Sequence, residues 1–143
     1  MAEQKKLKIL ITTDLYTTNT NGVVTSVQNL FDELTQKGHD VRILTVSSTI
    51  HSHKEGHVYY IQSIPLGAVY PNLRMPTSYR NKLIQEIIDW KPDIIHCNDW
   101  QSALTPLYYS CYYANRMGYE NIKTVFTIHN IQYQGKYGDE LLE

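Results

Sequence analysis

Three short polar stretches of this sequence carry side chains that could bind a hydroxylated molecule and move a proton. One contains Tyr16, Asn21 and Gly22, a second contains Asp99, and a third begins at His129. A histidine exchanges its proton near neutral pH, and a carboxylate accepts hydrogen bonds from hydroxyl groups. Whether these side chains can act together depends on the elements that carry them.

Apolar runs and their spacing predict those elements. Strands are expected at residues 7–13, 41–46, 58–61, 93–97 and 124–128, because each is short, apolar and flanked by polar residues. Apolar residues at helical spacing predict helices over residues 24–34, 79–90 and 103–117, with Gly38, Pro92 and Gly118 as stops. Residues 65–76 are expected to be irregular, and 138–143 to begin a helix.

Alternating strands and helices indicate an α/β fold, because parallel strands need a crossover, usually a helix. We expect a single domain over residues 1–143, a Rossmann-like, doubly wound parallel sheet of about five strands with helices on both faces. Ligands of such sheets bind beyond the carboxyl ends of the strands. This rule selects residues 17–22, 96–100 and 129–135, which would share one sheet edge.

The candidate catalytic residues are therefore His129 and Asp99. The candidate substrate-binding residues are Tyr16, Asn21, Gly22, Asn130, Tyr133 and Gln134. Backbone N–H groups near Gly22 could meet a phosphate or a sugar hydroxyl if a helix begins there.

Each of these residues also has a plainer interpretation. Asn21-Gly22 could be only a tight turn or a hairpin. Asp99 could simply cap the helix that follows it, and His129 could be structural. His51, His53 and His57 lack cysteine or aspartate partners at ligand spacing, so no metal site is expected.

Composition excludes some classes of protein. The formal net charge is -1 and the basic residues are scattered, which argues against binding of nucleic acid. We expect neither a signal peptide nor a membrane span, and membrane association is not favoured. The two cysteines, Cys97 and Cys111, form no C-x-x-C pair and are expected to be reduced in a cytoplasmic protein.

The second half of the chain resembles bacterial glycogen and starch synthases. The resemblance covers residues 92–143 and is carried by DIIHCNDWQSALTP at residues 93–106 and TVFTIHNIQYQG at residues 124–135. It implies retaining transfer of glucose from ADP-glucose or UDP-glucose to an α-1,4-glucan in a two-domain GT-B enzyme, with no other cofactor. It also implies that His129 contacts the donor sugar and that Asp99 lines the cleft.

By this resemblance the chain is the N-terminal, acceptor-side domain of such an enzyme. A C-terminal domain would supply most contacts to the donor nucleotide, so the chain alone is expected to be inactive. Its expected partners are a glucan or other sugar acceptor and that second domain, and a homodimer is possible in principle.

Residues 7–90 look different, because they resemble group 1 glycosyltransferases that act on diacylglycerol or small acceptors. The similar segments are DLY at 14–16, NGVVTS at 21–26, KGHDV at 37–41 and YYIQSIPLG at 59–67. Glycogen synthases carry Lys-Thr-Gly-Gly where this chain has Thr20-Asn21-Gly22, so a lysine contact to the donor phosphate is in doubt. The alternatives are a chimera, a lipid glycosyltransferase domain, and a non-catalytic or engineered Rossmann-like scaffold.

Overall fold

The computed structural model describes residues 5–17, 21–66, 73–78 and 80–132. Its main sheet has the strand order β3-β4-β2-β1-β7-β8, and every neighbouring pair is parallel except β3 with β4. The expected parallel, doubly wound sheet is thus confirmed. The strands are β1 (Lys8–Thr12), β2 (Asp40–Val46), β3 (His53–Glu55), β4 (Val58–Ile61), β7 (Ile94–Asn98) and β8 (Lys123–Thr127).

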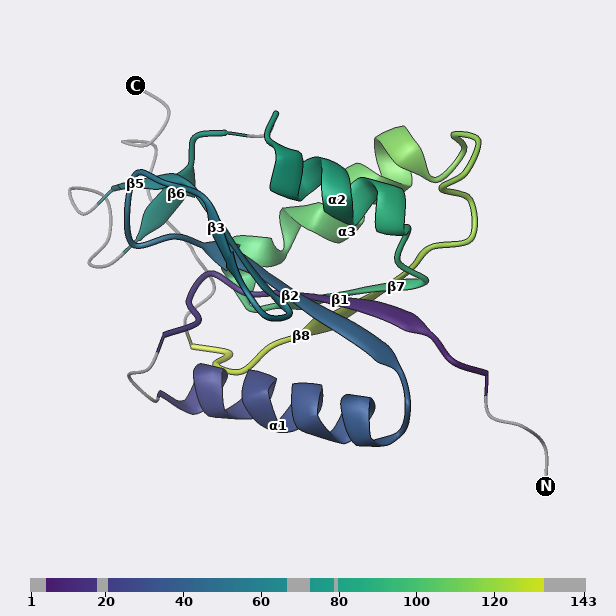
Figure 1. The fold of residues 1–143 in the computed structure, drawn as a ribbon, viewed down its shortest axis with the longest axis horizontal. Coiled ribbons are helices and arrows are strands. Elements are labelled where there is room, and N and C mark those ends of the chain that lie inside the picture. The colour runs from purple at the N-terminus through teal and green to yellow at the C-terminus, as the bar shows by residue number, and fades with distance from the viewer. Residues whose placement is uncertain (1–4, 18–20, 67–72, 79, 133–143) are drawn as a thin grey trace.

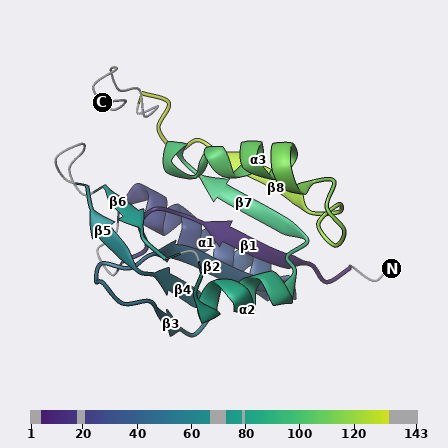
Figure 2. The same cartoon turned by 90° about the horizontal axis from the view of Figure 1, so that it is seen from above.

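Helices cover both faces of this sheet (Figure 1). Helix α1 (Gly22–Gln36) lies on one face, and α2 (Lys82–Trp90) and α3 (Leu104–Tyr108) lie on the other. Seen from above in Figure 2, α3 lies toward β7 and β8, and α2 lies beyond β1 in the opposite direction. The central strand β1 is therefore buried from both sides, which explains its continuous apolar run.

Alternate residues of the strands feed two separate cores. Ile9, Ile11 and Ile43 pack with Val27 of α1, whereas Leu10 and Tyr59 pack with α2. All of these side chains are less than a tenth exposed. Because successive strand residues point to opposite faces, the KILIT run of β1 serves both cores at once.

The helix boundaries follow local chemistry. Asn21 caps α1, since its side-chain oxygen accepts from the backbone N–H of Val24 at 2.9 Å, so the hairpin interpretation of Asn21-Gly22 is wrong. Gly38 ends the turn after α1 with φ of 86°, a left-handed conformation that glycine adopts without strain. Asn81 caps α2 in the same way as Asn21 caps α1.

Two expectations of length and regularity need correction. The single helix expected over 103–117 is instead α3, which follows a 3-10 turn (Trp100–Ser102), and a π-helical turn (Tyr109–Tyr113). Turns follow, and across them the Tyr109 hydroxyl donates to the Tyr119 carbonyl at 2.6 Å, a contact between residues ten apart that a continuous helix would not allow. Residues 65–76, which were expected to be irregular, include the end of β5 (Ser63–Pro65) and all of β6 (Arg74–Pro76), and these two strands pair antiparallel. Residues 67–72, and the helix start expected at 138–143, lie outside the described part.

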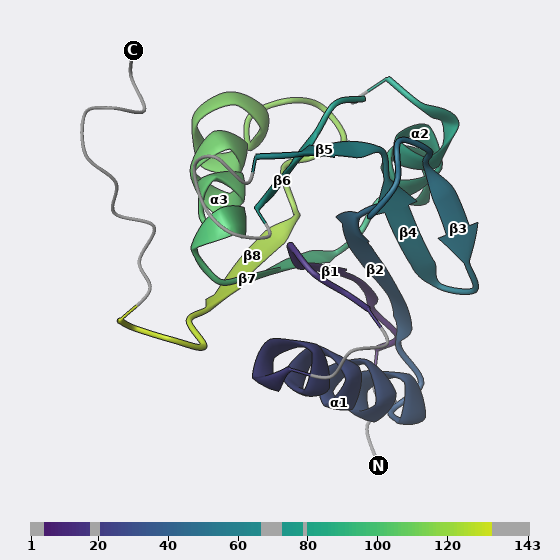
Figure 3. The same ribbon diagram turned by 90° about the vertical axis from the view of Figure 1, so that its left-hand side faces the viewer.

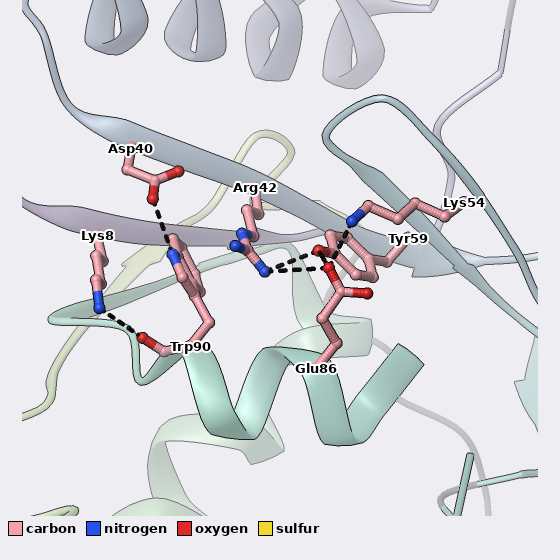
Figure 4. A network of polar contacts seen from close by, with 7 residues as sticks. All are labelled: Lys8, Asp40, Arg42, Lys54, Tyr59, Glu86 and Trp90. Atoms are coloured by element: carbon pink, nitrogen blue, oxygen red, sulfur yellow. Dashed lines mark hydrogen bonds and ion pairs between the residues drawn. The ribbon is translucent and has the colours of Figure 1, made fainter. Parts of the chain in front are cut away.

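A polar network joins α2 to the sheet (Figure 4). The Tyr59 hydroxyl donates to the Glu86 carboxylate at 2.6 Å, which also forms an ion pair with Lys54. The Trp90 indole N–H donates to Asp40 at 2.9 Å, and the Arg42 guanidinium lies 4.2 Å from the Trp90 ring centroid. Trp90 therefore stabilises the packing of α2 on the sheet in three ways: its ring is buried, its indole N–H is hydrogen-bonded, and its ring makes a cation–π contact.

We expect Trp90→Phe to lower the free energy of unfolding by about 1–3 kcal/mol, because it removes the Asp40 hydrogen bond and weakens the Arg42 contact. Urea denaturation followed by circular dichroism measures this. The control is Tyr112→Phe, on a ring that is 61% exposed, for which a change below about 0.5 kcal/mol is expected. Equal stability of the two variants would show that the network does not hold α2.

Candidate functional site

Polar side chains gather where strands β1, β7 and β8 end. The backbone N–H of Asp99, just after β7, donates to the Thr127 carbonyl at the end of β8 at 2.9 Å. The segment after β8 and the N-terminal end of α1 lie toward this same edge of the sheet (Figures 1 and 3). The segments that the sequence analysis selected after the ends of the strands do therefore lie toward one edge of the sheet, as far as they are described.

Asn98 is the buried centre of this edge, with only 2% of its surface exposed. Its amide nitrogen donates to the Thr12 carbonyl at 3.1 Å, and its amide oxygen lies 2.8 Å from the Nε2 atom of His129. Because the amide oxygen can only accept, Nε2 of His129 must carry the hydrogen of this bond. The Nδ1 atom of a neutral His129 ring is then left as an acceptor.

Asp99 contacts the backbone of His129, whereas Asn98 contacts its ring. Its carboxylate accepts from the His129 backbone N–H at 2.8 Å, so Asp99 and His129, the two candidate catalytic residues, are in direct contact. The carboxylate makes no capping bond to the 3-10 turn that follows, which shows that the capping interpretation of Asp99 is wrong. The Asp99 backbone has φ of 58° and ψ of 176°, a conformation that costs on the order of 1–3 kcal/mol.

Asp14 follows β1 and lies at the same edge of the sheet. Gln101 donates its amide N–H to the Asp14 carboxylate at 2.8 Å. Burial raises the pKa of the Asp14 carboxyl, and the negative charge of Asp99 raises it further. Two carboxylates are thus brought together in a partly buried place, where ionising both is costly.

His96 lies near the end of β7, on the face of the sheet that α1 covers. Its Nε2 atom lies 2.7 Å from the Thr127 hydroxyl oxygen. Burial lowers the pKa of the His96 imidazole, and the nearby His129 lowers it further. His96 is therefore a neutral hydrogen-bonding group at neutral pH, adjacent to His129.

Four of these residues were not named as candidates from the sequence. Asn98, Gln101 and His96 lie within the selected ranges or next to them, but only the geometry shows that Asn98 contacts His129, that Gln101 bonds Asp14 and that His96 contacts Thr127. The available signal was the pattern of polar residues that ends the apolar β7 run, HCNDWQ at 96–101. Asp14 carried the same signal after β1.

The remaining candidates lie in varied places. Gly22 begins α1, with no atom within 4 Å of the Cβ position that a larger residue would occupy there. The Tyr16 hydroxyl bonds the Gln28 side chain, and Tyr16 packs against the α1-side core. Asn130 accepts from the Gln132 backbone N–H at 3.0 Å within a turn. Tyr133 and Gln134 lie outside the described residues.

The described residues contain no group of three potential metal ligands. The His53 ring stacks on Tyr60 with ring centroids 4.6 Å apart, and the His57 ring lies near Phe31. These histidines therefore contact aromatic rings. In the described part of the chain, no helix has the length and apolar character needed to cross a bilayer.

Sequence comparison connects this site to one group of enzymes. A family model described as the starch synthase catalytic domain matches residues 78–143, which include Asp99 and His129. A glycogen synthase of Desulfitobacterium hafniense is 50% identical over 60 residues, which are 42% of this chain and 13% of that protein. A glycogen synthase of Clostridium acetobutylicum is 39% identical over 87 residues, or 59% of this chain and 18% of that protein.

Structural comparison extends the likeness of fold over nearly the whole chain. The solved catalytic domain of starch synthase IV from Arabidopsis thaliana, bound to ADP and acarbose, superposes with a TM-score of 0.62 at 20% identity, covering 96% of this chain and 37% of that one. At this identity the match shows the fold alone. The chain spans less than a fifth of the length of the two glycogen synthases compared. The chain is thus similar to glycogen and starch synthases over its second half, and it has a Rossmann-like fold.

Proposed function

We propose that this chain forms the acceptor-side part of a retaining glucosyltransferase that moves glucose from a nucleotide sugar to an α-1,4-glucan. The observation that supports this most directly is the contact of Asp99 with His129 at the carboxyl edge of the sheet. Both residues lie in the segment that matches the starch synthase family model. The choice between ADP-glucose and UDP-glucose stays open.

The geometry suggests a role for each group. With Nε2 of His129 bound to Asn98, its Nδ1 atom can accept a hydrogen bond from a sugar hydroxyl. The carboxylates of Asp99 and Asp14 can accept further hydroxyl hydrogens, and a negative charge at this edge would stabilise the positive charge that develops on a transferred sugar. These residues would bind and orient the sugar, while contacts to the nucleotide come from elsewhere.

The 143 residues alone are proposed to bind without turnover, because the relatives compared are several times longer. The resemblance of residues 7–90 to group 1 enzymes stays a prediction, and with it the possibility of a lipid acceptor or a chimera. A cytoplasmic location and a homodimer also stay predictions.

The test joins this chain to the C-terminal remainder of the Desulfitobacterium hafniense glycogen synthase and measures transfer from ADP-glucose and UDP-glucose to maltooligosaccharides. We expect the joined protein to turn over and His129→Ala to lower kcat by about 100-fold or more, because a group that contacts the reacting sugar is lost. His51→Ala, an exposed position in the loop before β3, is the control and should keep the rate.

Two results would contradict the proposal. A nearly unchanged rate in His129→Ala would remove His129 from the mechanism. Clear transfer by the 143 residues alone would disprove the claim that a second domain is needed for turnover. If the joined protein fails to fold, a joint with the Clostridium acetobutylicum enzyme provides the same comparison.

Asp14 offers a test of the electrostatics that does not need activity. Its raised pKa means that the folded state holds this proton more tightly than the unfolded state, so ionisation destabilises the fold as pH rises above the unfolded pKa. We expect Asp14→Asn to raise the Tm at pH 7 and to leave it little changed well below pH 3.8, where the aspartate is protonated in both states. A lower Tm at pH 7 than the unaltered chain would contradict the assigned burial cost.

A further inference from the structure

Helices α2 and α3 leave a hollow between them on their face of the sheet. Its inner part has a volume of about 220 Å³ and is lined mainly by apolar and tyrosine side chains, with Lys91 and Thr105 among them. Its outer part, about 400 Å³, reaches the carboxyl edge of the sheet. Leu10, Ile95 and Thr105 line both parts, so the two adjoin; together they are called the α2–α3 groove.

The groove is apolar along most of its length. Strand residues such as Leu44 and Ile61 and the helix residue Ile84 line the outer part, and Ile87 and Ile122 line the inner part. The views in Figures 2 and 3 agree that α2 and α3 stand apart. An apolar hollow of this size gains free energy when it takes up hydrocarbon.

The outer end is chemically different, because it holds a buried hydrogen-bonding atom without a partner. The side-chain oxygen of Gln101 is buried and makes no hydrogen bond within the described structure. Gln101 lines the outer part of the groove. An unmet buried polar atom costs on the order of 1–3 kcal/mol, which a ligand with hydroxyl groups could offset.

Charge at the outer end favours a neutral ligand. Arg74 lines it and donates to the Ser47 carbonyl, the Ser63 hydroxyl and the Ser63 carbonyl, all neutral acceptors, and no ion pair of Arg74 is found in the described part of the chain. The carboxylate of Asp14 lies on the same lining, within electrostatic reach of Asp99. Hydroxyl groups can donate to Asp14 and Gln101 and accept from Arg74. An anion would be attracted by Arg74 but repelled by both Asp14 and the nearby Asp99, so the balance of charge does not favour it.

We propose that the α2–α3 groove binds a single-chain amphiphile with a small, neutral, hydroxylated head. The head lies at the outer end against Gln101, Asp14 and Arg74, and the alkyl chain runs inward over Leu10 and Ile95. The groove is on the α2 and α3 face of the sheet, whereas His96 lies on the α1 face. Its outer end shares Asp14 and Gln101 with the candidate functional site. The binding does not depend on the proposed glucosyl transfer.

The test titrates the 143-residue chain with methyl, hexyl, octyl and decyl β-D-glucopyranosides below their micelle concentrations, using calorimetry and amide NMR shifts. Each added methylene is expected to lower Kd by about threefold to fourfold while the chain still fits the groove. The largest shifts are expected at Ile95, Gln101 and Thr105. Octanoate, which has an anionic head on a chain of similar length, is expected to bind less tightly than octyl glucoside.

Two variants locate the site. Thr105→Phe fills the place where the two parts adjoin and is expected to weaken octyl glucoside at least tenfold with little effect on methyl glucoside. Leu107→Phe, on a side chain of the same helix that is 56% exposed, is the matched control and should leave Kd unchanged. Gln101→Leu removes the unmet oxygen and should reduce the preference for octyl glucoside over octanoate.

Several outcomes would overturn the proposal. They are a Kd that does not depend on chain length, tighter binding of octanoate, and equal effects of Thr105→Phe and Leu107→Phe. A groove filled by a second copy of the chain would give concentration-dependent sedimentation without binding of any alkyl glucoside, which would also overturn it. Far-ultraviolet circular dichroism of each variant shows whether a lost interaction reflects loss of the fold.

Discussion

The buried side chain of Asn98 ties together the ends of three parallel strands. Its amide nitrogen bonds the last residue of β1, and its amide oxygen bonds the His129 ring just beyond β8. An amide has a donor and an acceptor at fixed positions, so this one residue sets both the spacing of the strand ends and the direction in which the imidazole faces. The candidate catalytic geometry depends on that constraint.

The cost of this arrangement is visible in the same few residues. Asp99 adopts a backbone conformation that is unfavourable for a residue with a side chain, and in doing so it places its carboxylate on the His129 backbone N–H. Asp14 is buried near a second carboxylate, which raises its pKa. Strain and unfavourable charge at one edge of an otherwise regular sheet are typical of functional sites, where stability is exchanged for a set geometry.

The parallel sheet was predictable from the sequence because its signal is local. The KILIT run of β1 and the helical spacing after Gly22 each indicate one element, and the crossover rule then orders them. Their ends were predictable to within a few residues for the same reason. The early end of the helix expected over 103–117 was not predictable, because no local pattern encodes a contact such as that of the Tyr109 side chain with the Tyr119 backbone.

The site was predictable only as an edge. The rule for strand ends placed Asp99 and His129 in one region, but their contact, the role of Asn98 and the partnership of Gln101 with Asp14 depend on side-chain directions that no spacing encodes. The same limit applies to the α2–α3 groove, which exists because two successive helices stand apart on one face of the sheet. Sequence patterns report which face a residue occupies, and not how far apart two helices pack.

The most direct test of the account is the tautomer of the His129 ring, measured by two-bond nitrogen–proton correlation NMR at a pH where the imidazole is neutral. The account predicts that the hydrogen resides on Nε2 and that Asn98→Ala abolishes this preference. A ring with its hydrogen on Nδ1, or a tautomer unaffected by loss of the Asn98 amide, would contradict the claim that Asn98 orients His129.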